Sequence, residues 1–491
     1  MPVTTLHTRA QLGVSAPPVR VETHLSGGLP AFSIVGLPEA AVRESRDRVR
    51  SALINCGFDF PQRRITVNLA PADLPKDGGR FDLPIALGIL AASGQLPTTA
   101  LDDTEFLGEL ALSGSLRSIN GVLPAALACG EAGRELLIPA DNADEAALVR
   151  TPVRAASTLL EVCQHLRGEA SLPVLDWRAP RATCGLAPCL SEVRGQSQAR
   201  RALEIAAAGA HSLLMSGPPG SGKSMLAKRL PGLLPPLSEH QALEVAAVHS
   251  LTRARDAAAF HEPPFRSPHH TASAVALVGG GSQPRPGEIS LAHHGVLFLD
   301  ELPEFERRVL EVLREPLETG EVNIARAARQ AVFPARFQLV AAMNPCPCGW
   351  LGDPERGCGY VCEKAKRYQR KLSGPLLDRI DLHMQVNAVA PEELTASETG
   401  EPSEVVRERV IAARQRQLER QRHLNNTLEG AALEPHLNPH RDWLATAMTR
   451  LGMSARALHR LVRVARTIAD LAGDDKVSRE HLREALAYRP Q

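Results

Sequence analysis

The stretch GPPGSGKS, from Gly217 to Ser224, constrains the fold of this chain more than any other feature of its sequence. It fits the pattern G-x-x-x-x-G-K-[ST], whose glycines let backbone N–H groups turn inward around a phosphate. An apolar stretch, SLLM, precedes it, and a helical stretch, MLAKRL, follows it. This order of strand, loop and helix predicts an α/β domain that binds a nucleoside triphosphate.

Each position of this loop has an expected role. Lys223 is expected to reach the β- and γ-phosphates, and Ser224 to ligate Mg²⁺. A chance loop rich in Gly, Pro and Ser is the alternative, which the correct flanking segments disfavour. The residues expected to surround the nucleotide phosphates are Gly217, Pro218, Pro219, Gly220, Ser221, Gly222, Lys223, Ser224 and Met225.

Two more apolar stretches end in polar residues that suit nucleotide hydrolysis. GVLFLDE ends in Asp300 and Glu301, and FQLVAAMN ends in Asn344. Continuous apolar strands are typical of a parallel sheet, and ligands bind at the carboxyl ends of such strands. We therefore expect Asp300 to hold Mg²⁺, Glu301 to activate the attacking water and Asn344 to orient that water or contact the γ-phosphate. A solvated acidic turn and an ordinary Asn-Pro turn are the alternatives.

Two arginines are candidates for stabilising the charge of the transition state. Arg379, in SGPLLDRIDLH, follows a predicted helix and could serve a neighbouring subunit. Arg456, in MSARALHRLV, opens a helix of the C-terminal region and could reach the same phosphates. Taken singly, each is more often a surface or salt-bridging residue.

A chain of 491 residues is too long for one hydrophobic core. Residues 1–168 alternate strand and helix patterns and predict an α+β domain; 169–189 are polar and contain proline, as linkers do. Residues 190–389 carry the predicted nucleotide site, and 390–491 are all helical, with an Arg-rich beginning. We interpret the last two blocks as an ATPase core and a helical lid.

The composition limits the partners and the compartment. The formal net charge is +1 and aromatic residues make up 3% of the chain, so any nucleic-acid contact must be a local basic patch. There is no secretory signal pattern and no long apolar run, which predicts a cytoplasmic protein without membrane contact. An odd number of cysteines, 9, is consistent with reduced thiols.

Four cysteines cluster directly after Asn344, in a segment that we interpret as an insertion over 345–363. The spacing is C-x-C-x₉-C-x₃-C, in a sequence rich in Gly and Pro. Four thiolates in one short segment suit tetrahedral Zn²⁺, although the C-x-C start departs from the usual spacing. Free thiols in a loop are the alternative. The predicted zinc ligands are Cys346, Cys348, Cys358 and Cys362.

Together these motifs resemble the AAA+ ATPases of the magnesium-chelatase-like group, most closely the bacterial ComM/YifB type. The resemblance implies a ring, a hexamer by expectation, with ATP and Mg²⁺ held between subunits. It makes Arg379 an arginine finger acting in trans and Arg456 the sensor-2 arginine, and it puts Val193 and Gln196 on the adenine side. Members of this type are associated with natural transformation, as helicases that drive branch migration on single-stranded and branched DNA.

The N-terminal block resembles the catalytic domain of Lon proteases. Arg80 stands where the serine nucleophile would align and Leu123 where the lysine base would align, so the resemblance implies a domain without protease chemistry. We interpret this domain as a scaffold or a DNA-engaging module. Lys76 and Arg80 are its candidate phosphate contacts.

A predicted hairpin, EVNIARAARQAVF, carries Arg326 and Arg329 near its turn and resembles the pore hairpins of this AAA+ branch. We expect these arginines to contact DNA, although a charged hairpin is often only a solvated edge. Two other functions remain open: a subunit of a metal-inserting magnesium chelatase, and a protein-remodelling ATPase.

Overall fold

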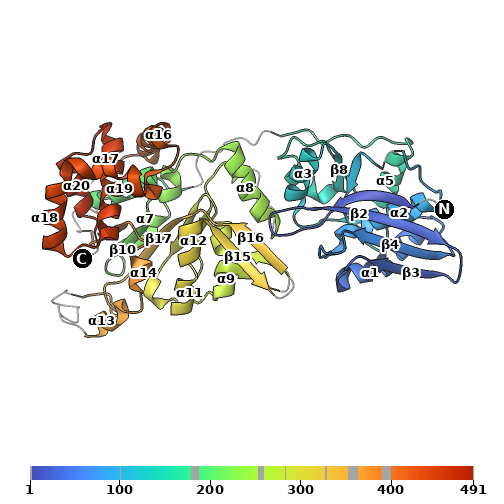
Figure 1. The fold of residues 1–491 in the computed structure, drawn as a ribbon, viewed down its shortest axis with the longest axis horizontal. Coiled ribbons are helices and arrows are strands. Elements are labelled where there is room, and N and C mark those ends of the chain that lie inside the picture. Colours follow the sequence, from blue (N-terminus) through green and yellow to red (C-terminus); the bar gives the residue numbers. More distant parts are fainter. Residues whose placement is uncertain are drawn as a thin grey trace. The chain divides into compact units, whose positions relative to one another are not determined.

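A computed structural model describes residues 3–99, 101–178, 187–252, 259–281, 284–326, 329–351, 363–389 and 400–489. The chain divides into two compact units, each described here by itself. One comprises 1–181 with 242–260 and 327–332; the other comprises 182–241, 261–326 and 333–491. Figure 1 shows both units and labels many of their helices and strands. Among the described helices, none has the length and hydropathy needed to cross a membrane.

The N-terminal unit is built on a mixed seven-stranded sheet in the order β3-β4-β2-β1-β5-β8-β9. Its first strands alternate buried and exposed side chains, and the buried side packs against the apolar helix α2. The strands are β1 (Thr4–Arg9), β2 (Pro18–Ser26), β3 (Ala31–Val35), β4 (Arg64–Ala70), β5 (Thr104–Phe106), β8 (Glu135–Pro139) and β9 (Val153–Ala156), with a small hairpin of β6 (Glu109–Leu110) and β7 (Leu116–Arg117). The helices are α1 (Ala40–Asn55), α2 (Asp82–Ala92), α3 (Val122–Glu131), α4 (Ala143–Ala146) and α5 (Leu159–Leu166).

The predicted DNA contacts of this unit are wrong, because both side chains are buried. Lys76 is 0% exposed and its ammonium group donates to the carbonyl of Pro71. Arg80 is 5% exposed, and its guanidinium donates to Gln11 Oε1 at 2.7 Å and to the carbonyl of Asn120. Burial lowers the pKa of Arg80 to about 10. Neither cation can reach a phosphate; both bind the unit's own backbone.

The C-terminal unit contains a five-stranded sheet whose strands are all parallel, in the order β11-β14-β17-β10-β18. Its three central strands are the apolar stretches recognised in the sequence, and nearly all their side chains are buried, as a sheet covered on both faces requires. The predicted α/β class is confirmed. The strands are β10 (Leu213–Ser216), β11 (Phe265–Arg266), β14 (Val296–Leu299), β17 (Gln338–Met343) and β18 (Leu382–Gln385).

Short helices connect these strands. They are α6 (Ser197–Gly209), α7 (Lys223–Ala227), α9 (Ala274–Val278), α10 (Glu288–Leu291), α11 (Arg307–Glu311), α12 (Arg314–Thr319), α13 (Glu363–Gln369) and α14 (Gly374–Leu377). Most of α8 (Glu239–Ser250) belongs to the other compact unit. Two hairpins interrupt the pattern: β12 (Gly279–Gly280) with β13 (Arg285–Pro286), and β15 (Glu321–Arg326) with β16 (Arg329–Pro334). The second hairpin lies where the sequence predicts one. The side chains of Arg326 and Arg329 lie outside the described part, so their DNA contact stays a prediction.

The predicted helical lid shares its core with the ATPase core. Figure 1 shows its helices gathered in the red, C-terminal part of the chain. Apolar residues of α16 and α19 join those of α6 in one cluster. Arg414 of α16 is half-buried and donates to the carbonyl of Ala207, so the Arg-rich run of this helix is partly structural. The helices are α16 (Ser403–Gln421), α17 (Glu434–Leu437), α18 (Arg441–Leu451), α19 (Ala455–Ala472) and α20 (Arg479–Leu486).

Candidate nucleotide-binding site

The carboxyl ends of three neighbouring parallel strands bring the predicted phosphate-binding residues together. The loop from Gly217 follows β10, Asp300 follows β14 and Asn344 follows β17. Because β17 pairs with both of the other strands, all three groups meet at one edge of the sheet.

The backbone of the phosphate loop needs its glycines. A Cβ at Gly217 would lie 2.1 Å from the carbonyl oxygen of Val386, the residue after β18. Gly220 and Gly222 have φ of +76° and +86°, in the left-handed region that favours glycine. Within the described residues, the buried Ser221 Oγ has no hydrogen-bond partner. These features fit a loop shaped to accept phosphate oxygens.

Lys223 opens α7 and its ammonium group lies within this loop. It donates to the carbonyls of Gly217 at 2.7 Å and Pro218 at 2.8 Å, and to Asn344 Oδ1 at 3.2 Å. Burial lowers the pKa of Lys223, and the carboxylate of Asp300 opposes this shift. The structure therefore joins the loop lysine and the strand-end asparagine in one hydrogen-bonded group.

Ser224 and Asp300 form a pair of oxygen ligands. Ser224 Oγ donates to Asp300 Oδ2 at 2.5 Å, and the other carboxylate oxygen accepts from the main-chain N–H of Glu301 at 2.9 Å. A hydroxyl and a carboxylate beside a phosphate site are ligands that Mg²⁺ prefers. These residues would hold Mg²⁺ directly or through water, and the ion would neutralise charge on the β- and γ-phosphates.

Glu301 stands at the entrance to the site in a strained conformation. Its φ is +53°, which is uncommon for a residue with a side chain and recurs at functional positions. Its carboxylate lies 3.1 Å from Nδ1 of His270, a residue that sequence reasoning did not single out. His270 lies 31 positions earlier in a polar insertion, so no local spacing could have linked the two.

The segment assigned to the adenine side contacts the phosphate loop directly. Gln196 has φ of +48° and its amide donates to the carbonyl of Ser221 at 2.7 Å. Val193 is fully buried, in the core shared with α6. Met225 is 37% exposed beside Gly222, which leaves it accessible to a ligand.

The two predicted arginines lie elsewhere on the unit, and they lie together. Arg379 and Arg456 line one pocket of about 800 Å³. The same pocket is lined by Ser212, Gln338 and Asp381, which stand at the amino ends of β10, β17 and β18. A four-residue strand such as β10 rises about 13 Å. The arginines therefore face the edge of the sheet opposite to the chain's own phosphate loop.

Arg379 has acceptors within its own chain. It donates to the carbonyl of Pro375 at 2.6 Å and forms an ion pair with Glu318 of α12. Arg456, in the first turn of α19, is exposed. Sequence reasoning missed Glu318, because the partner of an arginine 61 positions away leaves no local signal.

Comparison with known proteins agrees with this geometry. Residues 189–394 match the family described as magnesium chelatase, subunit ChlI; 21–142 match the subunit ChlI of Mg-chelatase, and 400–489 match its C-terminal region. The competence protein ComM of Haemophilus influenzae is 50% identical over 100% of this chain and 98% of its own length. The uncharacterized protein YifB of Salmonella typhimurium is 50% identical over 100% of this chain and 97% of its own length.

The chain belongs to the magnesium-chelatase-like AAA+ family, in its ComM/YifB group. A more distant relative is the magnesium-chelatase 38 kDa subunit of Cereibacter sphaeroides, 26% identical over 40% of this chain and 58% of its own length. The family is one of ATPases, which implies ATP and Mg²⁺ as ligands.

In this AAA+ chain the start of the cysteine segment packs on the phosphate loop. A Cβ at Gly349 would lie 2.4 Å from Pro219 Cδ, and the N–H of Gly349 donates to the carbonyl of Cys346 at 3.0 Å. Cys346 is buried, and its sulfur lies 3.1 Å from that of Cys348. Cys358 and Cys362 lie outside the described residues, so the predicted zinc site stays a prediction.

A tyrosine also links the cysteine segment with the magnesium side of the site. Tyr368 of α13 is buried, and burial together with the carboxylates of Glu304 and Glu301 raises its pKa to about 12. The next residue of α13, Gln369, donates its side-chain amide to the carbonyl of Pro345 at 3.2 Å, which joins this helix to the start of the cysteine segment.

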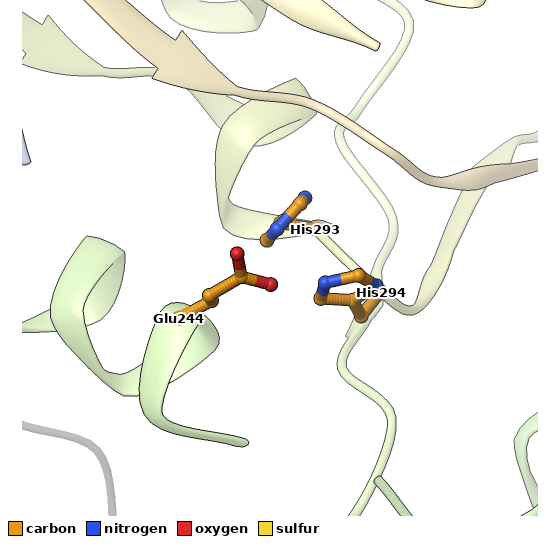
Figure 2. Close-up of side chains that lie close together, drawn as sticks. All are labelled: Glu244, His293 and His294. Carbon is orange, nitrogen blue, oxygen red and sulfur yellow. The ribbon is translucent and has the colours of Figure 1, made fainter. Parts of the chain in front are cut away.

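A histidine pair follows α10 in the AAA+ core. The ring centroids of His293 and His294 lie 3.9 Å apart. Figure 2 draws both side chains. His293 Nδ1 accepts from the main-chain N–H of Arg336 at 3.0 Å, which ties the pair to the segment before β17. Glu244, also drawn in Figure 2, belongs to the other compact unit, and we assign no metal site to these residues.

Proposed function

We propose that this chain forms a ring, a hexamer, in which ATP is hydrolysed between neighbouring subunits to drive translocation on DNA. The motor would act as a helicase that promotes branch migration during the integration of DNA in natural transformation or homologous recombination. The nucleotide-dependent part of this proposal has the strongest support.

One observation carries it: the two groups of residues that we propose for hydrolysis lie at opposite edges of one parallel sheet. The carboxyl ends present Lys223, Asp300 and Glu301, whereas Arg379 and Arg456 line the pocket at the amino ends. A cyclic assembly joins such unlike surfaces head to tail. Each interface would then receive a nucleotide from one subunit and two arginines from the next. These arginines would stabilise the negative charge that develops during phosphoryl transfer.

Two weaker observations support DNA as the substrate. The relative from Haemophilus influenzae is named a competence protein, and competence concerns the uptake of DNA. The hairpin β15–β16 precedes β17, and its turn region carries Arg326 and Arg329. Phosphate contacts by such residues would make binding weaken with salt.

Metal insertion is the second candidate, and the relative named a magnesium-chelatase subunit favours it. Protein remodelling without nucleic acid is the third. DNA-stimulated ATP hydrolysis separates the first candidate from both others, because neither of them predicts that DNA raises turnover.

We further propose that Cys346, Cys348, Cys358 and Cys362 hold one Zn²⁺ that braces the segment resting on the phosphate loop. Replacing Cys358 and Cys362 by serine should remove zinc, measured by metal analysis of the purified protein, and weaken ring assembly. Intact rings and unwinding without zinc would contradict this role.

The test is a branched-DNA unwinding assay, with ATPase measured in parallel with and without DNA. We expect the wild type to unwind, and Lys223→Ala and Glu301→Gln to fail. The Arg326→Ala, Arg329→Ala double variant should lose the DNA-stimulated part of its ATPase activity. ATP hydrolysis that DNA never stimulates would contradict the DNA function and leave the other two candidates.

A further inference from the structure

Arg460 is a buried arginine that ties the lid to the turn that carries Arg379. It is 7% exposed and lies on α19, one helical turn after Arg456. Its guanidinium donates to the carbonyl of Ile380 at 2.8 Å, to that of Leu377 at 3.1 Å and to Asp378 Oδ1 at 3.2 Å. These three acceptors surround Arg379 in the chain.

We propose that Arg460 is the positioning residue for both trans-acting arginines, so that Arg379 and Arg456 move as one rigid group. This inference rests on the proposed hydrolysis between subunits. Residues four apart on a helix share one face, so the backbone of α19 fixes Arg456 relative to Arg460. The guanidinium group of Arg460 then fixes the turn from Leu377 to Ile380, and with it the backbone of Arg379.

The planar guanidinium suits this role better than a lysine ammonium would. It offers several donors in a fixed geometry, and here it meets two carbonyls and a carboxylate at once. The bond to Ile380 is buried and the other two are partly buried, so the group is held more firmly than an exposed ion pair. A rotation of the lid would therefore carry Arg379 with it.

A second buried link connects the same two elements. His211, after α6, shares a hydrogen bond with Asp381 at 3.1 Å through Nδ1 and with Thr467 of α19 at 2.8 Å through Nε2. Asp381 follows the turn that Arg460 holds. Two buried contacts along one helix resist a hinge between the lid and the turn, whereas a single contact would allow pivoting.

The first test is steady-state kinetics of Arg460→Gln. Because a displacement of about 1 Å can cost about 100-fold in rate, we expect kcat to fall about 10- to 100-fold while KM for ATP stays within about twofold. Asp378→Ala removes one of the three acceptors at a half-exposed site and should lower kcat less, in the same direction. If Arg460→Gln does not fold, Asp378→Ala alone tests the proposal. Unchanged kcat in both variants would overturn the proposal.

The matched control is Arg416→Gln. Arg416 of α16 also donates to a main-chain carbonyl, that of Asp470 at 2.6 Å, but this bond lies within the lid. We expect kcat near that of the wild type. A loss as large as that of Arg460→Gln would mean that any weakened lid lowers turnover, which would overturn the specific role.

The deciding test mixes an inactive variant with an impaired one. Lys223→Ala subunits keep their arginines, and Arg460→Gln subunits keep their phosphate loop, so mixed rings should regain ATPase activity. The reference mixture is Lys223→Ala with Arg379→Ala. Recovery in the reference alone would overturn the role of Arg460 and leave the proposed function standing. If neither mixture regains ATPase activity, hydrolysis between subunits is contradicted. The proposed role of Arg460 then fails as well.

Discussion

At the scale of single residues, the site depends on a few side chains whose hydrogen bonds fix their orientation. Lys223 is held by the oxygens of Gly217, Pro218 and Asn344, and Ser224 is held by Asp300. The bonds from Lys223 to Asn344 and from Ser224 to Asp300 join groups at the ends of different strands. Small changes in one side chain should therefore alter hydrolysis without changing the fold.

Ser224→Ala removes one predicted ligand of Mg²⁺. Metal charge stabilisation contributes several kcal/mol, so we expect kcat to fall about 100-fold and the Mg²⁺ concentration for half-maximal rate to rise. An ATPase assay titrated with Mg²⁺ measures both. Ser224→Thr keeps the hydroxyl and should retain most activity; equal loss in the two variants would argue against a metal role for the hydroxyl.

His383 makes the stability of the C-terminal unit depend on pH. Burial, and then the charge of Arg460, lower its pKa from 6.5 to about 4, while its ring bonds to the carbonyl of Ile380. In the unfolded chain His383 becomes protonated below about pH 6.5, whereas in the folded chain it stays neutral down to about pH 4. Stability is thus fully present at neutral pH and falls as the pH drops through this window.

His383→Gln should remove this dependence. Between pH 7.5 and 5.0 we expect the wild type to lose about 2 kcal/mol more unfolding free energy than the variant. Urea unfolding at the two pH values measures the difference. Equal losses would show that His383 is protonated in the folded protein.

At the scale of elements, the turn from Cys346 to Gly349 acts as a support for the phosphate loop. Gly349 has φ of +84° and touches Pro219, so Gly349→Ala should push the loop and weaken ATP binding several-fold. Gly452→Ala is the matched control, since Gly452 has φ of +60° but no atom near its absent Cβ. Titration with a fluorescent ATP analogue compares them; equal effects would mean backbone strain alone is responsible.

The elements that the sequence predicts are those with a strong local pattern. The strand before Gly217, the apolar strands ending at Asp300 and Asn344, and the long helix α19 all lie where their patterns place them. The burial of Arg80 was not readable from the sequence, because its acceptors, Gln11 and Asn120, come from distant parts of the chain. The pairs His270–Glu301 and Glu318–Arg379 escaped prediction for the same reason.

At the scale of the whole molecule, the groups that we propose for hydrolysis lie at two opposite edges of the parallel sheet. The phosphate loop occupies one edge, and the pocket with Arg379 and Arg456 lies at the other. A single subunit would then bind ATP without hydrolysing it efficiently. Assembly into a ring would supply the missing cations, and the buried contacts of Arg460 would couple their position to the lid.

The most direct test of this account is the ATPase activity of an equal mixture of Lys223→Ala and Arg379→Ala subunits. Each interface takes its phosphate loop from one subunit and its arginines from the next, so about one quarter of the interfaces should be intact. We predict about one quarter of wild-type activity from two variants that are each inactive. A mixture no more active than its components would contradict a site shared between subunits.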